Sequence, residues 1–278
     1  MNVTSLETLS PFRYPGGKTW LLPISVQWLK SMPKVKEFFE PFAGGAITGL
    51  TAANLGLFDR VTIVEKDMEV AAVWKTILHG DAEWLANEIE EFDISPEHIE
   101  ERLGMPIQSE RDLAFRTLLR NRTNRGGIIA PGSSILKNGE NGKGVKSRWY
   151  PATLKSRILK IASLSKRINF VEGDGVQTMK ANIGRKDAAF FIDPPYTVGG
   201  KKAGKRLYSH SELDHECLFN ITSQLKGQFL MTYDNVVRVK EMAAQYEFET
   251  RTIYMRNSHH AQLTELLIAK NMKWFIAS

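Results

Sequence analysis

Short apolar runs recur along the chain, and segments with helical spacing separate them. The runs lie at 38–42, 61–64, 169–171, 188–192 and 228–232, with helical spacing at 47–57 and 211–225. Strands that alternate with helices predict a mostly parallel sheet covered by helices on both faces. Two later runs, at 250–254 and 266–270, predict a strand pair that lies antiparallel at a sheet edge. We therefore expect an α/β fold with a mostly parallel sheet and an antiparallel edge strand.

Between residues 74 and 166 this alternation is interrupted by charged helices and a polar loop. Residues 109–119 have helical spacing, and the loop at 137–144 contains two Asn-Gly pairs, which are typical of hairpin turns. A chain of 278 residues fits one large domain that carries a smaller insert. We predict that residues 1–73 and 167–278 form the α/β domain. Residues 74–166 would form an inserted, mainly helical subdomain with a β-hairpin.

Charge is distributed unevenly along the insert. Residues 120–167 contain twelve Lys and Arg and one acid, Glu140, whereas 81–112 contain eleven acids and two Arg. Such runs are often only solvated helix faces, but the basic run also holds amide and aromatic side chains, which suit contact with nucleic acid. The net charge of +6 and the pI near 9.3 agree with a polyanionic partner. The predicted contacts are Arg120, Asn121, Arg122, Asn124, Arg125, Lys137, Asn138, Lys143, Lys146 and Arg148.

Composition excludes several other classes of protein. Hydrophobic residues make up 42% of the chain, which is enough for a core, and no run of about 18 apolar residues predicts a membrane span. The first residues lack the features of an export signal. A single cysteine, Cys217, rules out an internal disulfide or a Cys-based metal cage, and His259-His260 has no partner ligands at metal spacing. We expect an intracellular protein without a metal site.

The apolar run at 188–192 ends in Asp193-Pro194-Pro195-Tyr196. The two prolines hold φ near about −65° and donate no N–H, so the turn is stiff and its carbonyl groups stay available. The Asp193 carboxylate and the Pro194 carbonyl would accept hydrogens from an exocyclic amine and localise the nitrogen lone pair. The ring of Tyr196 can stack on a base. This turn predicts catalytic roles for Asp193, Pro194 and Tyr196.

A second motif, Glu-Pro-Phe-Ala-Gly-Gly-Ala at 40–46, lies between a predicted strand and a predicted helix. In a Rossmann-like sheet this is where a nucleoside-containing cofactor binds. Glu65 ends the next strand, at the usual place for an acid that binds ribose hydroxyls. Ala46 stands where the dinucleotide fingerprint has its second glycine, so the motif predicts a nucleoside cofactor without specifying a dinucleotide.

Two weaker motifs complete the set. The segment 14–19 ends in Gly-Lys-Thr, but Phe12 stands where a P-loop needs its first glycine, so we do not expect an ATP site. Its two adjacent glycines would let a ligand approach the backbone, and Lys18 could meet a carboxylate. Asp174 follows the strand at 169–171 and could accept a hydrogen bond from an adenine amine. Simple turns would explain either motif on its own.

The order of these motifs resembles that of the Dam-type DNA adenine-N6 methyltransferases. Tyr-Pro-Gly-Gly-Lys at 14–18, the loop at 40–45, Glu65, a basic insert and Asp-Pro-Pro-Tyr follow one another, and the resemblance extends from residue 12 to about residue 270. Shorter matches lie at 118–122, 207–209 and 264–267. The resemblance implies S-adenosylmethionine as methyl donor, no metal, and an adenine flipped out of duplex DNA. The implied cofactor site consists of Tyr14, Lys18, Phe42, Ala43, Gly44, Glu65, Asp174 and Asp193.

The sequence also departs from the best-known members of that family. Tyr14 replaces the more usual Trp-Ala, and the loop at 136–143 differs from the Arg-Gly-Glu-Phe-Asn pattern of enzymes that read GATC. The recognition sequence and the biological role, such as restriction protection, therefore stay open. Alternative hypotheses are an inactive DNA-binding protein, or an amino methyltransferase acting on RNA adenine or cytosine N4. No obligatory protein partner is evident, so we expect a monomer. We also expect a cytoplasmic protein that is associated with DNA and encoded by a bacterium or a phage.

Overall fold

A seven-stranded sheet forms the centre of the computed structural model, which describes residues 7–13, 17–130, 132–137, 139, 142–198, 213–256 and 262–276. The strand order is β3-β2-β1-β4-β5-β7-β6, and all pairs are parallel except β5–β7 and β6–β7. The predicted strand pair lies at the sheet edge, with its reversed strand, β7, inserted between β5 and β6. The mostly parallel α/β fold is thus confirmed. The bounds are β1 Glu37–Glu40, β2 Arg60–Glu65, β3 Ile168–Glu172, β4 Ala188–Ile192, β5 Gln228–Asp234, β6 Glu249–Arg256 and β7 Gln262–Ala269.

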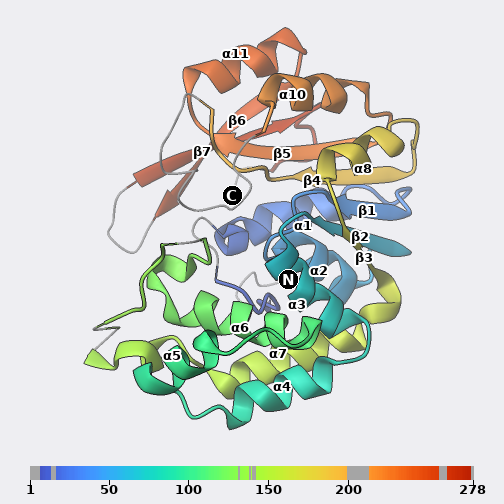
Figure 1. Cartoon of the computed structure of the whole chain (residues 1–278). Coiled ribbons are helices and arrows are strands. Elements are labelled where there is room, and N and C mark those ends of the chain that lie inside the picture. Colours follow the sequence, from blue (N-terminus) through green and yellow to red (C-terminus); the bar gives the residue numbers. More distant parts are fainter. Residues whose placement is uncertain are drawn as a thin grey trace.

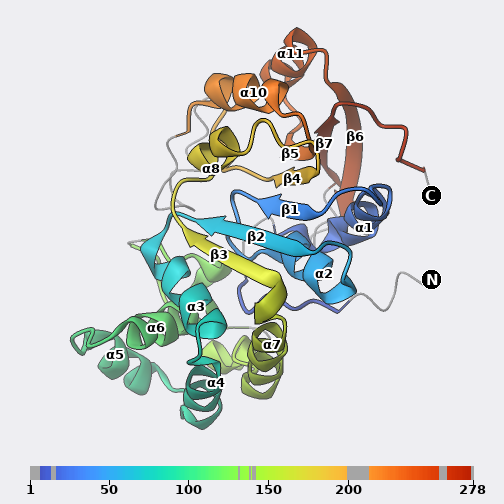
Figure 2. The same ribbon diagram turned by 90° about the vertical axis from the view of Figure 1, so that its right-hand side faces the viewer.

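Helices cover both faces of the sheet (Figures 1 and 2). All five residues of β4 are buried; Ala189 and Phe191 belong to one hydrophobic cluster, and Ala188, Phe190 and Ile192 belong to the other. This follows from the alternation of side chains along a strand. One face is covered by α1 (Leu22–Lys30), α2 (Ile47–Leu55) and α3 (Met68–Leu78), and a 3-10 turn at Lys18–Leu21 precedes α1. The other face is covered by α8 (Gly175–Ala181), α10 (His215–Gln224) and α11 (Val237–Gln245). Among the described helices, none combines the length and apolar character needed to cross a membrane.

The predicted insert is helical and packs against the α3 side of the sheet (Figure 2). Its helices are α4 (Ala82–Glu91), α5 (Pro96–Gly104), α6 (Glu110–Thr123) and α7 (Pro151–Ser163), with 3-10 turns at Arg125–Gly127, Gly144–Ser147 and Ser165–Arg167. Phe115 and Leu154 of the insert belong to the same buried cluster as Leu50 and Val61 of the sheet domain. The boundary predicted at residue 74 falls inside α3. The insert therefore shares its core with the sheet domain.

The β-hairpin predicted at 137–144 is not found among the described residues of that loop. Gly139, Gly142 and Gly144 have positive φ angles of 61°, 72° and 54°, and the chain then enters a 3-10 turn. Two Asn-Gly pairs supply turn geometry, but a hairpin also needs flanking residues that pair as strands, and lysines and glycines do not favour strands. Residues 138, 140 and 141 lie outside the described residues.

Candidate active site

Acidic side chains gather where the order of the parallel strands reverses direction. From β1 the chain continues outward to β2 and β3, whereas β4 and β5 lie on the other side of β1. Glu65 lies at the carboxyl end of β2, Asp174 follows β3, and Asp193 follows β4. In open α/β sheets, ligands bind in the crevice outside the strand carboxyl ends at such a switch point.

Asp193 is held at this edge through one of its two oxygens. Its Oδ1 accepts hydrogen bonds from the hydroxyls of Tyr196, at 2.9 Å, and Thr232 on β5, at 2.6 Å. The Lys18 Nζ lies 3.2 Å from the same oxygen. Among the described residues no group donates to Oδ2. Three donors thus fix the carboxylate and leave one oxygen for a further donor.

A second carboxylate, Glu265 on β7, completes this network. Lys18 Nζ lies 3.4 Å and 3.5 Å from its two oxygens, and the Tyr196 hydroxyl, whose single proton faces Asp193 or Glu265, lies 3.4 Å from its Oε2. Glu265 is only 3% exposed, and this burial raises its pKa to about 7 against the opposing charge of Lys18. Burial lowers the pKa of Lys18, but the attraction of Asp193 and Glu265 outweighs it, so the net pKa of Lys18 is raised.

Sequence reasoning did not identify Glu265 as a functional residue. It belonged to a short segment that matched the family, and no role was derived for it. The sequence pattern that could have indicated Glu265 is an acid followed directly by the apolar residues Leu266, Leu267 and Ile268. All three are buried in the structure. A charged side chain in such a strand is rarely buried without a partner.

Side chains of β5 and α10 also pack against the Asp-Pro-Pro-Tyr turn. The ring of Tyr196 stacks on that of Tyr233, with centroids 5.7 Å apart. His215 joins the two elements, because its Nδ1 lies 2.8 Å from the Tyr233 hydroxyl and its Nε2 lies 2.8 Å from the Thr197 hydroxyl. His215 was not predicted, since its link to the turn depends on how α10 packs. Within the described part of the chain, no group donates a hydrogen bond to the Pro194 carbonyl.

The glycine loop after β1 is shaped by Glu65. Its Oε2 accepts the Gly44 N–H at 2.9 Å, and its Oε1 accepts the N–H groups of Lys66 and Asp67, each at 2.8 Å. Trp74 donates its indole N–H to the Gly44 carbonyl at 3.0 Å. A carboxylate offers about four acceptor positions. Among the described residues, three of these positions are occupied, and a fourth is open to a further donor. Burial raises the pKa of Glu65 to about 7.

Glu40 has a structural role in the same loop. Ala46 has a left-handed φ of 48° and supplies no side-chain cap to α2. The Glu40 Oε2 accepts the Gly49 N–H at 2.7 Å, so a buried carboxyl group replaces the usual capping side chain. A Cβ on Gly49 would lie 2.7 Å from that oxygen, which explains the glycine. Burial raises the pKa of Glu40 to about 8, so this group is mostly protonated at neutral pH.

Asp174 is placed against the loop by the start of α8. Its Oδ1 accepts the N–H groups of Val176 and Gln177 at 2.9 Å and 3.1 Å, and its Oδ2 lies 3.2 Å from Lys66 Nζ. A Cβ on Gly175 would lie 1.9 Å from the Pro41 carbonyl, so only glycine permits this close approach. Burial acts to raise the pKa of Asp174, but its hydrogen bonds and Lys66 outweigh this, and the net pKa is lowered.

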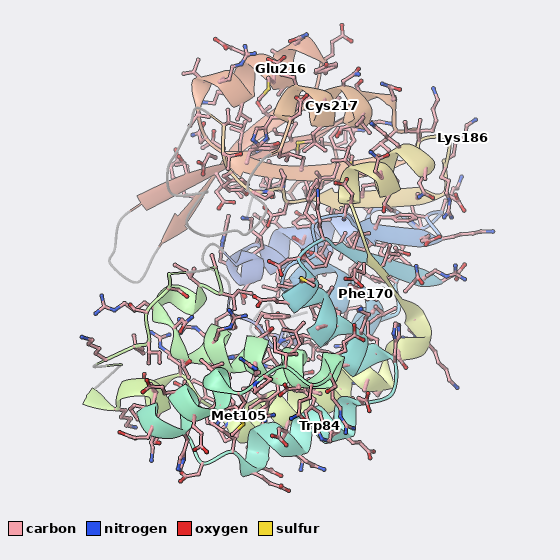
Figure 3. The ribbon with its side chains drawn as sticks, in the orientation of Figure 1. Trp84, Met105, Phe170, Lys186, Glu216 and Cys217 are labelled. Carbon is pink, nitrogen blue, oxygen red and sulfur yellow. The ribbon has the colours of Figure 1, made fainter. Side chains whose placement is uncertain are left out.

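The structure thus gathers most of the predicted cofactor residues at one edge of the sheet. Those that it brings together are Lys18, Phe42, Ala43, Gly44, Glu65, Asp174 and Asp193. Tyr14 lies outside the described residues, as do His259, His260 and the segment at 207–209. Cys217 lies half-buried on α10 (Figure 3). Within the described ranges, no group of three or more His, Cys, Asp or Glu side chains is arranged to hold a metal ion.

Three of the predicted DNA contacts are buried and hold the insert together. Asn121 is fully buried and donates to the carbonyls of Arg13 and Gly127 at 2.8 Å and 2.7 Å. Arg122 is 4% exposed and donates to the Pro11 carbonyl. Asn124, also 4% exposed, donates to the Ile128 carbonyl at 2.9 Å. Because these side chains are buried and bonded to backbone carbonyls, we do not retain them among the proposed DNA contacts.

The other predicted contacts lie nearer the surface of the insert. Arg120 is half-buried and paired with Glu69, and Arg148 is half-buried. Asn138 lies outside the described residues. A pocket between α5 and the loop is lined by three lysines together with apolar groups such as Leu103 and Ile135. The exposed members of the predicted set are Arg125, Lys137, Lys143 and Lys146.

The sheet order, the switch point and the carboxylates at its edge define a Rossmann-like α/β protein of the kind that binds a nucleoside cofactor. Residues 14–261 match the model of the D12 class N6 adenine-specific DNA methyltransferases, and the chain belongs to this family. The predicted resemblance is therefore confirmed, and the family implies S-adenosylmethionine and a DNA substrate.

Known proteins outside the family model add only distant similarity. No curated protein matches the chain. The rRNA methyltransferase aviRa from Streptomyces viridochromogenes is 10% identical, with 97% of this chain and 93% of that one covered and a TM-score of 0.40. A SAM-dependent methyltransferase from Agrobacterium tumefaciens is 11% identical, with 90% of this chain and 60% of that one covered and a TM-score of 0.41.

Proposed function

We propose that this methyltransferase acts at a specific site in duplex DNA and holds a flipped adenine with Asp193, Pro194 and Tyr196. The observation that carries the proposal is the Asp193 carboxylate, whose Oδ1 has three donors while Oδ2 has none among the described residues. An adenine N6 cannot reach a buried methyl group while the base is stacked, so the base must leave the helix.

The turn at Asp193 acts on the adenine amine. N6 is a poor nucleophile because its lone pair is conjugated with the purine ring. Asp193 Oδ2 and the Pro194 carbonyl would each accept one N6 hydrogen, which localises the lone pair on nitrogen. When N6 gains the methyl group it loses one proton, and Asp193 lies where it can accept that proton. Positioning and preorganised acceptors therefore supply the main contribution of the protein.

S-adenosylmethionine supplies the electrophilic methyl group when it is bound. The residues present fit such a group: Glu65 has one acceptor position left for a ribose hydroxyl, and Asp174 lies beside the same loop. The loop formed by Phe42, Ala43 and Gly44 would pass beneath the methionine part, with Tyr14, Lys18 and Asp193 nearby. Because transfer in one displacement needs only positioning and acceptors, we propose that no metal takes part.

We propose that residues 74–166 recognise the target DNA, while 1–73 and 167–278 carry the chemistry. Lys and Arg on the insert surface would contact phosphates, which makes affinity fall steeply with salt. The protein would act as a monomer in the cytoplasm of a bacterium or of a phage-infected cell. The contacts that we retain for this role are Arg120, Arg125, Lys137, Asn138, Lys143, Lys146 and Arg148.

The deciding experiment replaces Asp193. We expect Asp193→Ala to lower methyl transfer from tritiated S-adenosylmethionine to duplex DNA on the order of 10³-fold, because it removes a preorganised acceptor. DNA affinity, measured by fluorescence anisotropy, should change little. The matched control is Asp59→Ala, an exposed aspartate just before β2, which should keep full activity. Retained transfer in the Asp193→Ala variant would refute the assignment.

A second measurement separates an active enzyme from an inert DNA-binding protein. Calorimetric titration of the wild-type protein with S-adenosylmethionine should show one site, and Glu65→Ala should weaken it. DNA isolated after expression in a host without adenine methylation should contain N6-methyladenine. DNA without this base, together with the absence of cofactor binding, would contradict the proposed function.

A further inference from the structure

The Lys18 ammonium lies between two carboxylates, only one of which has a role in the proposed reaction. Its Nζ is 3.2 Å from Asp193 and 3.4 Å from the nearer oxygen of Glu265. The Tyr196 hydroxyl also contacts both acids, at 2.9 Å and 3.4 Å. Lys18 further lies over the Tyr196 ring, 4.7 Å from its centroid. Glu265 is thus joined to Asp193 twice, through a cation and through a hydroxyl.

The charges of Lys18, Asp193 and Glu265 determine how strongly Asp193 attracts an N6 hydrogen. An ammonium paired with Asp193 alone would neutralise most of the negative potential that attracts an N6 hydrogen. Both side chains are largely excluded from water, with Lys18 6% and Glu265 3% exposed, so solvent screens their charges little. When Glu265 is ionised, two carboxylates share one ammonium among the described residues, so Lys18 neutralises Asp193 less completely.

The fold holds Glu265 in place. It pairs in register with Asp234 on β5 and with Ile253 on β6, so its backbone is fixed on both sides. Among the described residues, the ionisable groups around it are Lys18, Asp193 and Tyr196, with Asp234 opposite it on the neighbouring strand. Glu265 contacts the groups that contact Asp193, and it makes no direct bond to Asp193.

We propose that Glu265 is a positioning residue for methyl transfer. It balances part of the charge of Lys18 and contacts the Tyr196 hydroxyl, so that Lys18 neutralises Asp193 less completely and Asp193 directs Oδ2 toward the adenine amine. This inference rests on the role proposed above for Asp193. Both the negative charge and the length of the Glu265 side chain contribute to this role. Substitutions that change the charge and the length separately can test this.

The test compares two substitutions that separate charge from shape. Glu265→Gln keeps the size and removes the charge, whereas Glu265→Asp keeps the charge and shortens the side chain. We expect single-turnover methyl transfer to fall on the order of 100-fold in the Gln variant and about 10-fold in the Asp variant, as for a misplaced catalytic group. The control is Glu216→Gln, an exposed acid on α10 (Figure 3), which should keep the wild-type rate.

Thermal unfolding and DNA affinity are measured for all variants, so that loss of fold is recognised. A folded Gln variant that transfers methyl groups at the wild-type rate, or as fast as the Asp variant, would overturn the proposal. Failure of the Asp193 assignment is seen separately, as activity retained in Asp193→Ala. If Asp193 proves essential while Glu265→Gln is fully active, only the inference about Glu265 fails.

Discussion

Two buried cations, Lys18 in the candidate active site and Arg122 in the insert, meet very different partners. Lys18 lies against two carboxylates, and their attraction raises its pKa. Arg122 donates to the backbone carbonyl of Pro11, and no described carboxylate pairs with it. Burial, with added repulsion from Arg157 and Arg13, lowers the pKa of Arg122 to about 9. Lys18 thus compensates the charge of two carboxylates, whereas Arg122 serves as a hydrogen-bond donor to a backbone carbonyl.

The difference shows that the basic insert is also a scaffold. Three insert side chains bond to the backbone of the segment at 10–13. Asn121 accepts from the Arg13 N–H and donates to the Arg13 carbonyl, each at 2.8 Å. Arg122 donates to the Pro11 carbonyl, and Arg157 donates to the Ser10 carbonyl at 3.1 Å. This segment leads directly to the turn that carries Lys18. A cation in a basic run can therefore support the active site without touching DNA.

The largest expected effect on the free energy of unfolding comes from removing the Lys18 ammonium. Lys18→Met leaves two carboxylates buried together, and breaking a buried pair costs about 3–5 kcal/mol of unfolding free energy. The cost should be larger at pH 8 than at pH 6. Without Lys18 the pKa of Glu265 rises above its present value of about 7. An acid with a raised folded-state pKa stabilises the fold at low pH, and this stability is lost as pH rises through that pKa.

Urea unfolding at the two pH values measures this effect. Lys34→Met, an exposed lysine beyond α1, is the control and should show no pH-dependent loss. Equal destabilisation of the Lys18→Met variant at pH 6 and pH 8 would break the comparison, because charge compensation would then not be the role of Lys18.

A smaller effect is expected from Arg122→Met. The substitution leaves the Pro11 carbonyl without its donor, which costs about 1–3 kcal/mol. Because arginine is charged at both pH 6 and pH 8, the loss should be the same at both. Urea unfolding provides the measurement. If the variant is as stable as the wild type, Arg122 does not act as a clamp and the comparison with Lys18 fails.

The smallest change in stability is expected at the insert surface. Lys146→Ala removes an exposed side chain and should alter the unfolding free energy by less than about 0.5 kcal/mol. If Lys146 contacts a phosphate, the slope of log K against log salt should become shallower by about 1. Fluorescence anisotropy at several salt concentrations measures this slope. A slope changed by Arg122→Met and unchanged by Lys146→Ala would reverse the roles assigned to these two residues.

The strands were the part of the fold most readily predicted from the sequence. The run at 188–192 coincides with β4 because all five of its side chains are apolar and buried. The hairpin predicted at 137–144 is not found among the described residues of that loop, since turn residues alone do not supply strands that pair. The position of β7 between β5 and β6 could not be predicted, because either order would satisfy the same apolar pattern.

Site residues could be predicted where a short local motif contains both the strand and the functional side chain at its end. Asp193 and Glu65 each follow an apolar strand directly, and parallel strands bring their carboxyl ends together. Glu265 and His215 depend on contacts between elements far apart in the chain, so local pattern does not indicate them. The burial of Asn121 and Arg122 could not be predicted for a related reason, since a basic run does not show which of its members face inward.

The insertion of β7 between β5 and β6 has a consequence for how the site assembles. Lys18 and Glu265 are separated by 247 residues along the chain, and β7 brings them together. Contacts between such distant segments depend on closing a long loop, so they form with the sheet and not within one local element. The pair of carboxylates around Lys18 is therefore complete when β7 has joined β5.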